Sequence, residues 1–220
     1  MQAIEMTPYF GTFESHVTVR AESPERVKRF RDLCREQGLK CILIELARGL
    51  YHSQPMTATH HQGSLEDAVT QARAIAECLG SNGFEVTRVK VEADPTTSGV
   101  PRTDEDAARL PTANYFEFHL LVTLTRLSDL PALSGLCAEH NAHLSMNAFK
   151  QAAGEETERF VTMRLKGMGG ARAANLFDKL AGAIELAGYQ TSKRVHEYVV
   201  YDTNLTLDDG WMNPPAALNL

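Results

Sequence analysis

The stretch FESH at residues 13–16 returns 103 residues later as FEFH at residues 116–119. From Thr57 onward, which matches Thr162, the offset between similar residues is 105. A near-constant spacing that extends over several elements is typical of an internal duplication. We therefore expect the 220-residue chain to contain two copies of one structural unit.

Each copy carries the same order of predicted elements. The apolar and polar residues of FESHVTVR, residues 13–20, alternate as in a half-buried strand. Ser23-Pro24-Glu25 provides an N-cap, a first-turn proline and an acid, so a helix begins there. Gly38 ends this helix. The first copy continues with strands 40–46 and 54–61, a helix between Gly63 and Gly83, and strand 85–92; the second has strand 116–124, helix 129–140, strands 143–149 and 158–166, helix 170–187 and strand 190–201.

The order β-α-β-β-α-β is the ferredoxin-like, or split βαβ, motif, in which both helices cover one face of an antiparallel sheet. We expect an α+β fold of two tandem ferredoxin-like units related by a pseudo-twofold duplication. Two such copies resemble a fused dimeric α+β barrel or a head-to-tail pair. The expected boundaries are repeat 1 at residues 10–93, a linker loop at 94–113, repeat 2 at 114–201 and an irregular tail at 202–220. The tail contains Trp211 and is either disordered or covers a cavity mouth or a partner.

Composition excludes several classes of function. The chain has 22 Lys and Arg against 28 Asp and Glu, a net charge of −6, which argues against broad nucleic-acid binding. No apolar run approaches the ~20 residues of a membrane helix, and the N-terminus lacks the pattern of a signal peptide, so we expect a cytoplasmic protein. None of the cysteines at 34, 41, 78 and 137 forms a C-x-x-C pair, so we expect reduced thiols.

Alternation along the strands predicts which side chains face away from the helices. If the two sheets pack against each other, these free faces line a shared polar cavity; otherwise they are solvated. The predicted free-face residues are Glu14, His16, Thr18, Arg20, Arg88, Lys90 and Glu92 in the first copy, then Glu117, His119, Leu121, Thr123, His143, Ser145, Asn147, Thr162, Arg164, Lys166, Lys193, Val195 and Glu197 in the second; by the repeat, Thr57, Thr59 and His61 are assigned to the same face.

The duplicated Glu-x-His pairs, Glu14/His16 and Glu117/His119, are the main functional candidates. On one strand face, residues two apart lie roughly 7 Å from each other. That spacing suits a carboxylate that orients a catalytic histidine, or two ligands of one metal. Imidazole titrates near neutral pH and is therefore suited to acid/base chemistry.

His16-Val17-Thr18-Val19 resembles the H-Φ-[S/T]-Φ motif of the two-histidine phosphoesterases. In that family two such motifs face each other in pseudo-symmetric lobes. The resemblance implies an acid or base role for His16 and phosphate binding by Thr18. The second copy departs from the motif, because Leu121 stands where the hydroxyl residue belongs.

Two further features carry weaker predictions. The glycine-rich segment from Lys166 to Arg172 either cradles an anion at a helix start or forms a tight connection. His52, His60 and His61 fall in a predicted hairpin, where solvated side chains are expected more than a metal site. Nucleophile-elbow, P-loop and Rossmann motifs are absent from the sequence.

The sequence thus favours an enzyme, a hydrolase or transferase, that acts on a small anionic, phosphorylated substrate in a polar cavity between the repeats. His16 and His119 are the predicted acid/base pair, oriented by Glu14 and Glu117. The predicted anion-binding residues are Thr18, Arg88, Lys90, Arg164 and Lys166. The alternatives are a non-catalytic ligand-binding or oligomerisation module, such as a homodimer, and a metal enzyme that uses the two Glu-x-His pairs. The sequence does not identify a cofactor.

Overall fold

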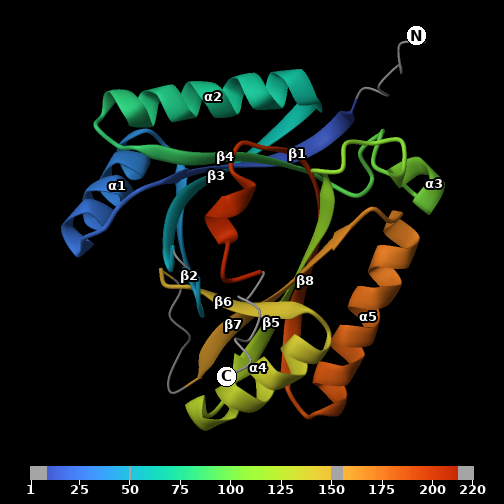
Figure 1. Cartoon of the computed structure of the whole chain (residues 1–220). Helices are drawn as coiled ribbons and strands as arrows, with labels where there is room; N and C mark the ends of the chain where they lie inside the picture. The colour runs from blue at the N-terminus through green and yellow to red at the C-terminus, as the bar shows by residue number, and fades with distance from the viewer. Residues whose placement is uncertain (1–8, 50, 150–155, 213–220) are drawn as a thin grey trace, which may run out of the picture.

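The computed structural model describes residues 9–49, 51–149 and 156–212. The order β-α-β-β-α-β occurs twice along the chain, with four helices outside a ring of strands (Figure 1). The first unit comprises β1 (Phe10–Val19), α1 (Pro24–Glu36), β2 (Lys40–Leu46), β3 (Ser53–Ser64), α2 (Leu65–Ser81) and β4 (Val86–Ala93); the second comprises β5 (Tyr115–Leu124), α4 (Leu130–Glu139), β6 (Ala142–Asn147), β7 (Thr157–Lys166), α5 (Gly170–Leu186) and β8 (Gln190–Asp202). Between them lies α3 (Asp104–Ala107), and short 3-10 turns η1 (Leu127–Asp129) and η2 (Leu205–Asp208) follow β5 and β8. The predicted α+β class with antiparallel, ferredoxin-like units is confirmed.

The two four-stranded sheets join into one closed barrel. Strand order is β4-β1-β3-β2 in the first unit and β8-β5-β7-β6 in the second. Antiparallel pairs β2–β6 and β4–β8 connect the units, for example through Ile44 opposite Asn147 and Lys90 opposite Asp202. Closure removes the exposed sheet edges and gives every strand one face toward the helices and one toward the barrel interior. The sheet faces that the helices leave free are therefore enclosed by the chain itself.

Local sequence explains where the helices begin and end. Ser23 accepts a hydrogen bond from the Arg26 amide at the start of α1, and Gly38 adopts a φ of +67° just beyond its end. Ser64 and Asp67 form a capping box at α2. These helix limits agree with the sequence signals to within a residue or two.

The start of α5 is built differently, and this decides the role of the glycine-rich segment. Asp104 of the connection accepts a hydrogen bond from the Gly169 amide at 2.8 Å and pairs with Arg172 at 2.7 Å. A Cβ on Gly169 would lie 2.4 Å from the carbonyl carbon of Thr103. The turn is therefore a close backbone crossing, and a carboxylate of the chain itself occupies the helix N-terminus.

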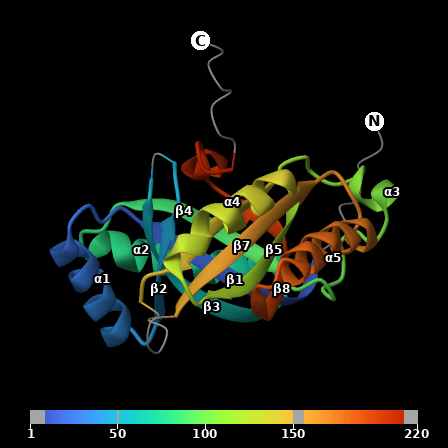
Figure 2. The same cartoon turned by 90° about the horizontal axis from the view of Figure 1, so that it is seen from below.

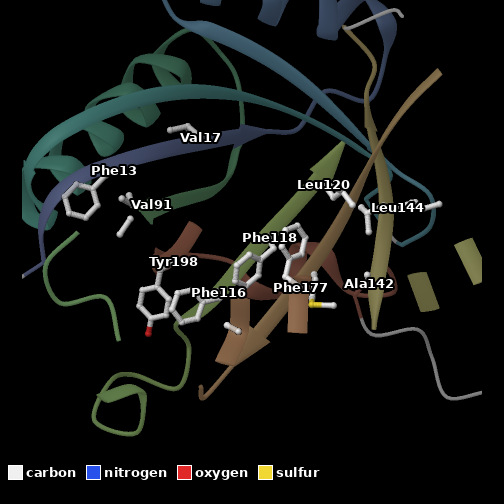
Figure 3. Close-up of a cluster of buried hydrophobic side chains, with 14 of the residues drawn as sticks. Phe13, Val17, Val91, Phe116, Phe118, Leu120, Ala142, Leu144, Phe177 and Tyr198 are labelled. Atoms are coloured by element: carbon white, nitrogen blue, oxygen red, sulfur yellow. The ribbon is translucent and has the colours of Figure 1, made fainter. Parts of the chain in front are cut away.

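A cluster of buried apolar side chains extends over both units between the barrel and the helices (Figure 3). In the second unit Phe118 and Phe177 have ring centroids 4.9 Å apart, and Phe116 lies 4.6 Å from Tyr198. In the first unit Phe13 and the residues near it pack beneath α2. Because this core uses the outer strand faces, the inner faces remain available for polar residues.

One part of the predicted strand orientation is wrong. The sequence assigned Thr57, Thr59 and His61 to the free face, but His61 contacts Ser15 at 2.6 Å and Gln71 of α2 at 3.0 Å, on the helix side. Glu14 pairs with His60, whereas Glu117 pairs with Arg164, so β3 and β7 are related by an offset of 104. The helix caps Ser64 and Gly169 differ by 105. The offset between the two units therefore grows from 103 at β1 and β5 to 104 at β3 and β7, and to 105 at the helix caps. A shift of one residue turns every side chain of a strand to its other face.

No helix in the described part of the chain combines the length and the apolar character needed to span a bilayer. All four cysteines are free thiols, with Cys34 and Cys137 buried.

Candidate functional site

The barrel encloses a cavity of about 230 Å³. Charged and polar side chains of β1, β4, β5, β7 and β8 form one part of its wall. An apolar part comes chiefly from β2, which presents Ile42, Ile44 and Leu46, together with Met56 and Phe160. The sequence missed this apolar wall. The feature that could have predicted this wall is the nearly unbroken apolar run KCILIEL at residues 40–46, which is typical of a strand buried on both faces.

The chain after β8 covers one mouth of the barrel. In Figure 1 its turn η2 lies across the ring of strands, and in Figure 2 it lies at one end of the barrel. Trp211 is 4% exposed; its Nε1 donates to the Leu144 carbonyl at 3.0 Å, and Arg48 donates to the Trp211 carbonyl at 3.3 Å. For the described residues up to 212, the tail therefore covers the cavity mouth, one of the alternatives that the sequence left open. Residues 213–220 lie outside the described residues.

His16 lies inside the barrel with both ring nitrogens engaged. Nδ1 donates to the Thr57 carbonyl at 3.0 Å, and Nε2 lies 2.9 Å from a carboxylate oxygen of Glu92. Both partners are acceptors, so both nitrogens carry protons and the ring is an imidazolium. Burial alone would lower the pKa of His16, but the hydrogen bond and the charge of Glu92 outweigh burial and raise it.

His119 occupies the corresponding place in the second unit. Its Nε2 lies 3.3 Å from Glu117 and 3.5 Å from Glu197, and its Nδ1 lies 2.9 Å from the Thr162 hydroxyl. Burial opposes the charged ring, but hydrogen bonds to the two glutamates prevail and raise the pKa of His119 to about 9. Burial and the charge of Glu92 also raise the pKa of Glu197. At neutral pH His119 therefore keeps its second proton.

Lys90 joins the two Glu-x-His pairs into one network. Its Nζ lies 2.6 Å from Glu92 and 3.5 Å from Glu117. Glu117 in turn accepts from Arg164 Nε at 2.6 Å. Despite burial, which acts to raise it, the charges of Arg164 and Lys90 hold the pKa of Glu117 well below its usual value. The structure thus brings together His16, His119 and Glu117, with Glu14 at the rim of the same network.

Three of the four predicted anion-binding cations, Arg88, Lys90 and Arg164, are already paired with carboxylates. Arg88 forms a two-pronged pair with Asp202, and Arg88 Nη1 and Arg164 Nη1 both contact Asp208, at 2.8 and 2.7 Å. Thr18 is buried in the cavity wall. Lys166 is exposed at the end of β7, 5.7 Å from the ring of Tyr115, and is not among the lining residues.

The sequence also missed Asp202 and Asp208. They lie at the end of β8 and in the tail, where no periodic pattern predicts that they contact the arginines of the cavity. The only signal in that region is Trp211, the one tryptophan of the chain.

The remaining histidines do not form a metal site. The side chain of His60 is 69% exposed, at the outer side of Glu14, and His52 is exposed in the loop before β3. Within residues 9–49, 51–149 and 156–212, no group of three or more His, Cys, Asp and Glu side chains is arranged to hold a metal ion. Cations already pair with the carboxylates that a metal would need, since Lys90 contacts Glu92 and Glu117, and Arg164 contacts Glu117.

No family model matches the chain, and a search of curated proteins finds no match. Several solved structures resemble its fold, including the following two. The regulatory subunit of aspartate kinase from Thermus thermophilus, in its ligand-free form, is 14% identical and aligns over 81% of this chain and 97% of its own, with a TM-score of 0.32. A protein named as a candidate chlorite dismutase is 9% identical over 86% of this chain and 94% of its own, with a TM-score of 0.28. These are distant likenesses of fold.

Proposed function

We propose that the chain is an enzyme that binds a small anionic substrate of the phosphoester class inside the barrel and transfers a proton to it from His119. The observation that carries this proposal is the charge of the cavity wall. Five cations and five carboxylates line the cavity: Lys40, Arg88, Lys90, Arg164 and Lys193 against Glu14, Glu92, Glu117, Glu197 and Asp208. Asp202 at the end of β8 adds a sixth carboxylate through its pair with Arg88, so the five cations and the two protonated histidines leave an excess of one positive charge that favours an anion.

The geometry supports different roles for the histidines than the acid/base pair predicted from the sequence. His119 is engaged at both nitrogens too, but its Nδ1 contacts the Thr162 hydroxyl, which both accepts and donates, so the imidazolium can pass a proton through Thr162 to a leaving oxygen as its bond to phosphorus breaks. Glu117 and Glu197 hold this ring in place and favour its charged form. His16 is also cationic and engaged at both nitrogens, so it is a positive charge for the substrate and not a base.

The proton acceptor that the geometry favours is Glu14. Its side chain is 21% exposed, and its ion-pair contacts with His16, Lys40 and His60 are long, at 3.9–4.0 Å. A water molecule that attacks the phosphorus can therefore lose its proton to Glu14. The apolar wall of Ile42, Ile44 and Phe160 fits a substrate that joins an apolar body to its anionic head.

Calorimetric titration with inorganic phosphate and with phenyl phosphate tests this function, together with an assay of phosphate release from phenyl phosphate. We expect saturable binding of both, tighter for phenyl phosphate, and at least tenfold weaker binding to His119→Gln. His60→Gln is the matched control, because His60 is exposed outside the network. Absence of saturable binding, or equal affinity of the two variants, would contradict the proposal.

The second candidate function, ligand binding without catalysis, is favoured by one observation: both ring nitrogens of His16 are already engaged within the chain. It predicts the same binding but no phosphate release. The phosphate-release assay therefore separates the two functions.

A further inference from the structure

The strongest unexplained feature of the cavity is a carboxylate that does not belong to the barrel. Asp208 stands in η2, on the irregular chain after β8, and is 3% exposed. One oxygen, Oδ2, accepts from Arg88 Nη1 at 2.8 Å and Arg164 Nη1 at 2.7 Å. The other, Oδ1, accepts from Gln54 Nε2 at 2.9 Å. Three donors from β4, β7 and β3 thus converge on one carboxylate that enters the cavity from its mouth.

Charge balance does not require Asp208. Arg88 already has a two-pronged partner in Asp202, and Arg164 already has Glu117. The guanidinium groups of Arg88 and Arg164 therefore contact three carboxylates in all, those of Asp202, Glu117 and Asp208. The field at the third position is nonetheless positive: burial would raise the pKa of Asp208, but Arg164 and Arg88 lower it to about 2. This position favours an anion even after both arginines have a carboxylate of their own.

We propose that Arg88, Arg164 and Gln54 form the oxyanion-binding subsite of the barrel, and that Asp208 fills it in place of the ligand. Guanidinium groups match the planar fork of a carboxylate and the oxygens of a phosphate equally well, so the shared chemistry is an oxyanion head. A ligand that binds there displaces Asp208 and with it the tail that covers the mouth. This inference rests on the proposed function, because both place the anion inside the same cavity.

The contacts of the tail make this exchange measurable. The Trp211 ring lies 5.6 Å from the Arg164 guanidinium, and its Nε1 is bonded to Leu144. Displacement of Asp208 therefore moves the only tryptophan of the chain out of a buried setting. Its fluorescence reports the exchange in the full-length wild-type protein without a label.

The first experiment compares Asp208→Ala with Asp209→Ala, since Asp209 is the exposed neighbour. Removal of the internal competitor is expected to tighten the apparent Kd for inorganic phosphate at least tenfold in Asp208→Ala and to leave it unchanged in Asp209→Ala. Equal affinities in the two variants would overturn the proposal. Because Asp202 and Glu117 still neutralise the arginines, Asp208→Ala is expected to fold.

The second experiment needs no variant. Titration of the wild-type chain with phosphate is expected to shift the Trp211 emission to longer wavelength with the same apparent Kd as binding, and chloride at equal ionic strength is expected to give no shift. A parallel titration with acetate distinguishes a carboxylate from a phosphate head: the anion with the lower apparent Kd is the preferred class. A Trp211 emission that phosphate and acetate both leave unchanged would overturn the exchange.

The outcomes separate this inference from the proposed function. If His119→Gln weakens phosphate binding while Asp208→Ala leaves it unchanged, the function stands and the Asp208 inference fails. If the wild-type chain and Asp208→Ala both fail to bind phosphate, the proposed function and the inference fail together.

Discussion

The two units of the barrel have matching strands and matching histidines, but they differ in the residues that contact their glutamates. His16 and His119 occupy corresponding positions on β1 and β5, and each lies next to a glutamate on the neighbouring strand, Glu92 or Glu197. Opposite the preceding glutamate, however, the first unit has His60 and the second has Arg164. His60 is exposed, whereas Arg164 enters the cavity and binds Glu117.

This difference gives the glutamate of the second unit, Glu117, more close ion pairs than Glu14 of the first. Lys90 of the first unit reaches across to Glu117, so Glu117 receives Lys90, Arg164 and His119, while Glu14 has only long contacts. The two units therefore have histidines at matching positions, whereas the residues that differ surround Glu117 with close cations and leave Glu14 with long contacts only. Three variants or conditions test the contrast, from the largest expected effect to the smallest.

Neutralising the two glutamates should have unequal effects on stability. Glu117→Gln leaves Lys90 and Arg164 buried without their shared carboxylate, which is expected to cost about 3–5 kcal/mol of unfolding free energy. Glu14→Gln removes only long, partly exposed contacts and is expected to cost no more than about 1 kcal/mol. Urea denaturation of both variants measures the difference, and equal losses would mean that the two units hold their glutamates alike.

The pH dependence of stability should follow His119. Its pKa is raised in the folded chain, from 6.5 to about 9. The associated stabilisation is therefore complete below about pH 6.5 and is lost as pH rises through 9, by a value on the order of 3 kcal/mol. Urea denaturation between pH 6 and 10 measures this slope.

His119→Gln is expected to flatten that slope and His60→Gln to preserve it. A wild-type stability that does not change over the same range would show that His119 is neutral in the folded chain.

The smallest effect concerns the second nitrogen of each histidine. Thr162→Val removes the hydroxyl that contacts His119 Nδ1 and is expected to cost about 1 kcal/mol. It should change the pKa of His119 but not that of His16, whose Nδ1 donates to a backbone carbonyl that no side-chain substitution removes. Histidine NMR signals of the variant, with His16 as the internal reference, provide the test; equal shifts at both rings would contradict it.

Much of the barrel interior could be predicted from the sequence, because alternation along a strand is a local property. Glu14, His16, Glu117, His119, Lys90 and Arg164 all line the cavity as expected from their parity. The assignment failed for Thr57, Thr59 and His61 because it relied on an offset of 105, which holds for α2 and α5 but not for β3 and β7. A single inserted residue is invisible in a weak repeat and still inverts a strand face.

The rest of the site depends on contacts that no local pattern encodes. Asp208 meets Arg88 and Arg164, 120 and 44 positions away in the chain, only because the tail folds back over the barrel mouth. The protonation of the histidines likewise follows from tertiary partners. Their residue type predicts acid/base work, and the acceptors around them raise the pKa of both rings.

The most direct test of a proton-rich anion site is an NMR titration of the full-length chain that follows the ring signals of His16 and His119 between pH 5 and 10. The pKa of His119 is predicted to be about 9 and that of His16 to lie above 6.5, and added phosphate is predicted to raise both. Titration of both rings at or below 6.5, with no response to phosphate, would contradict the proposed site.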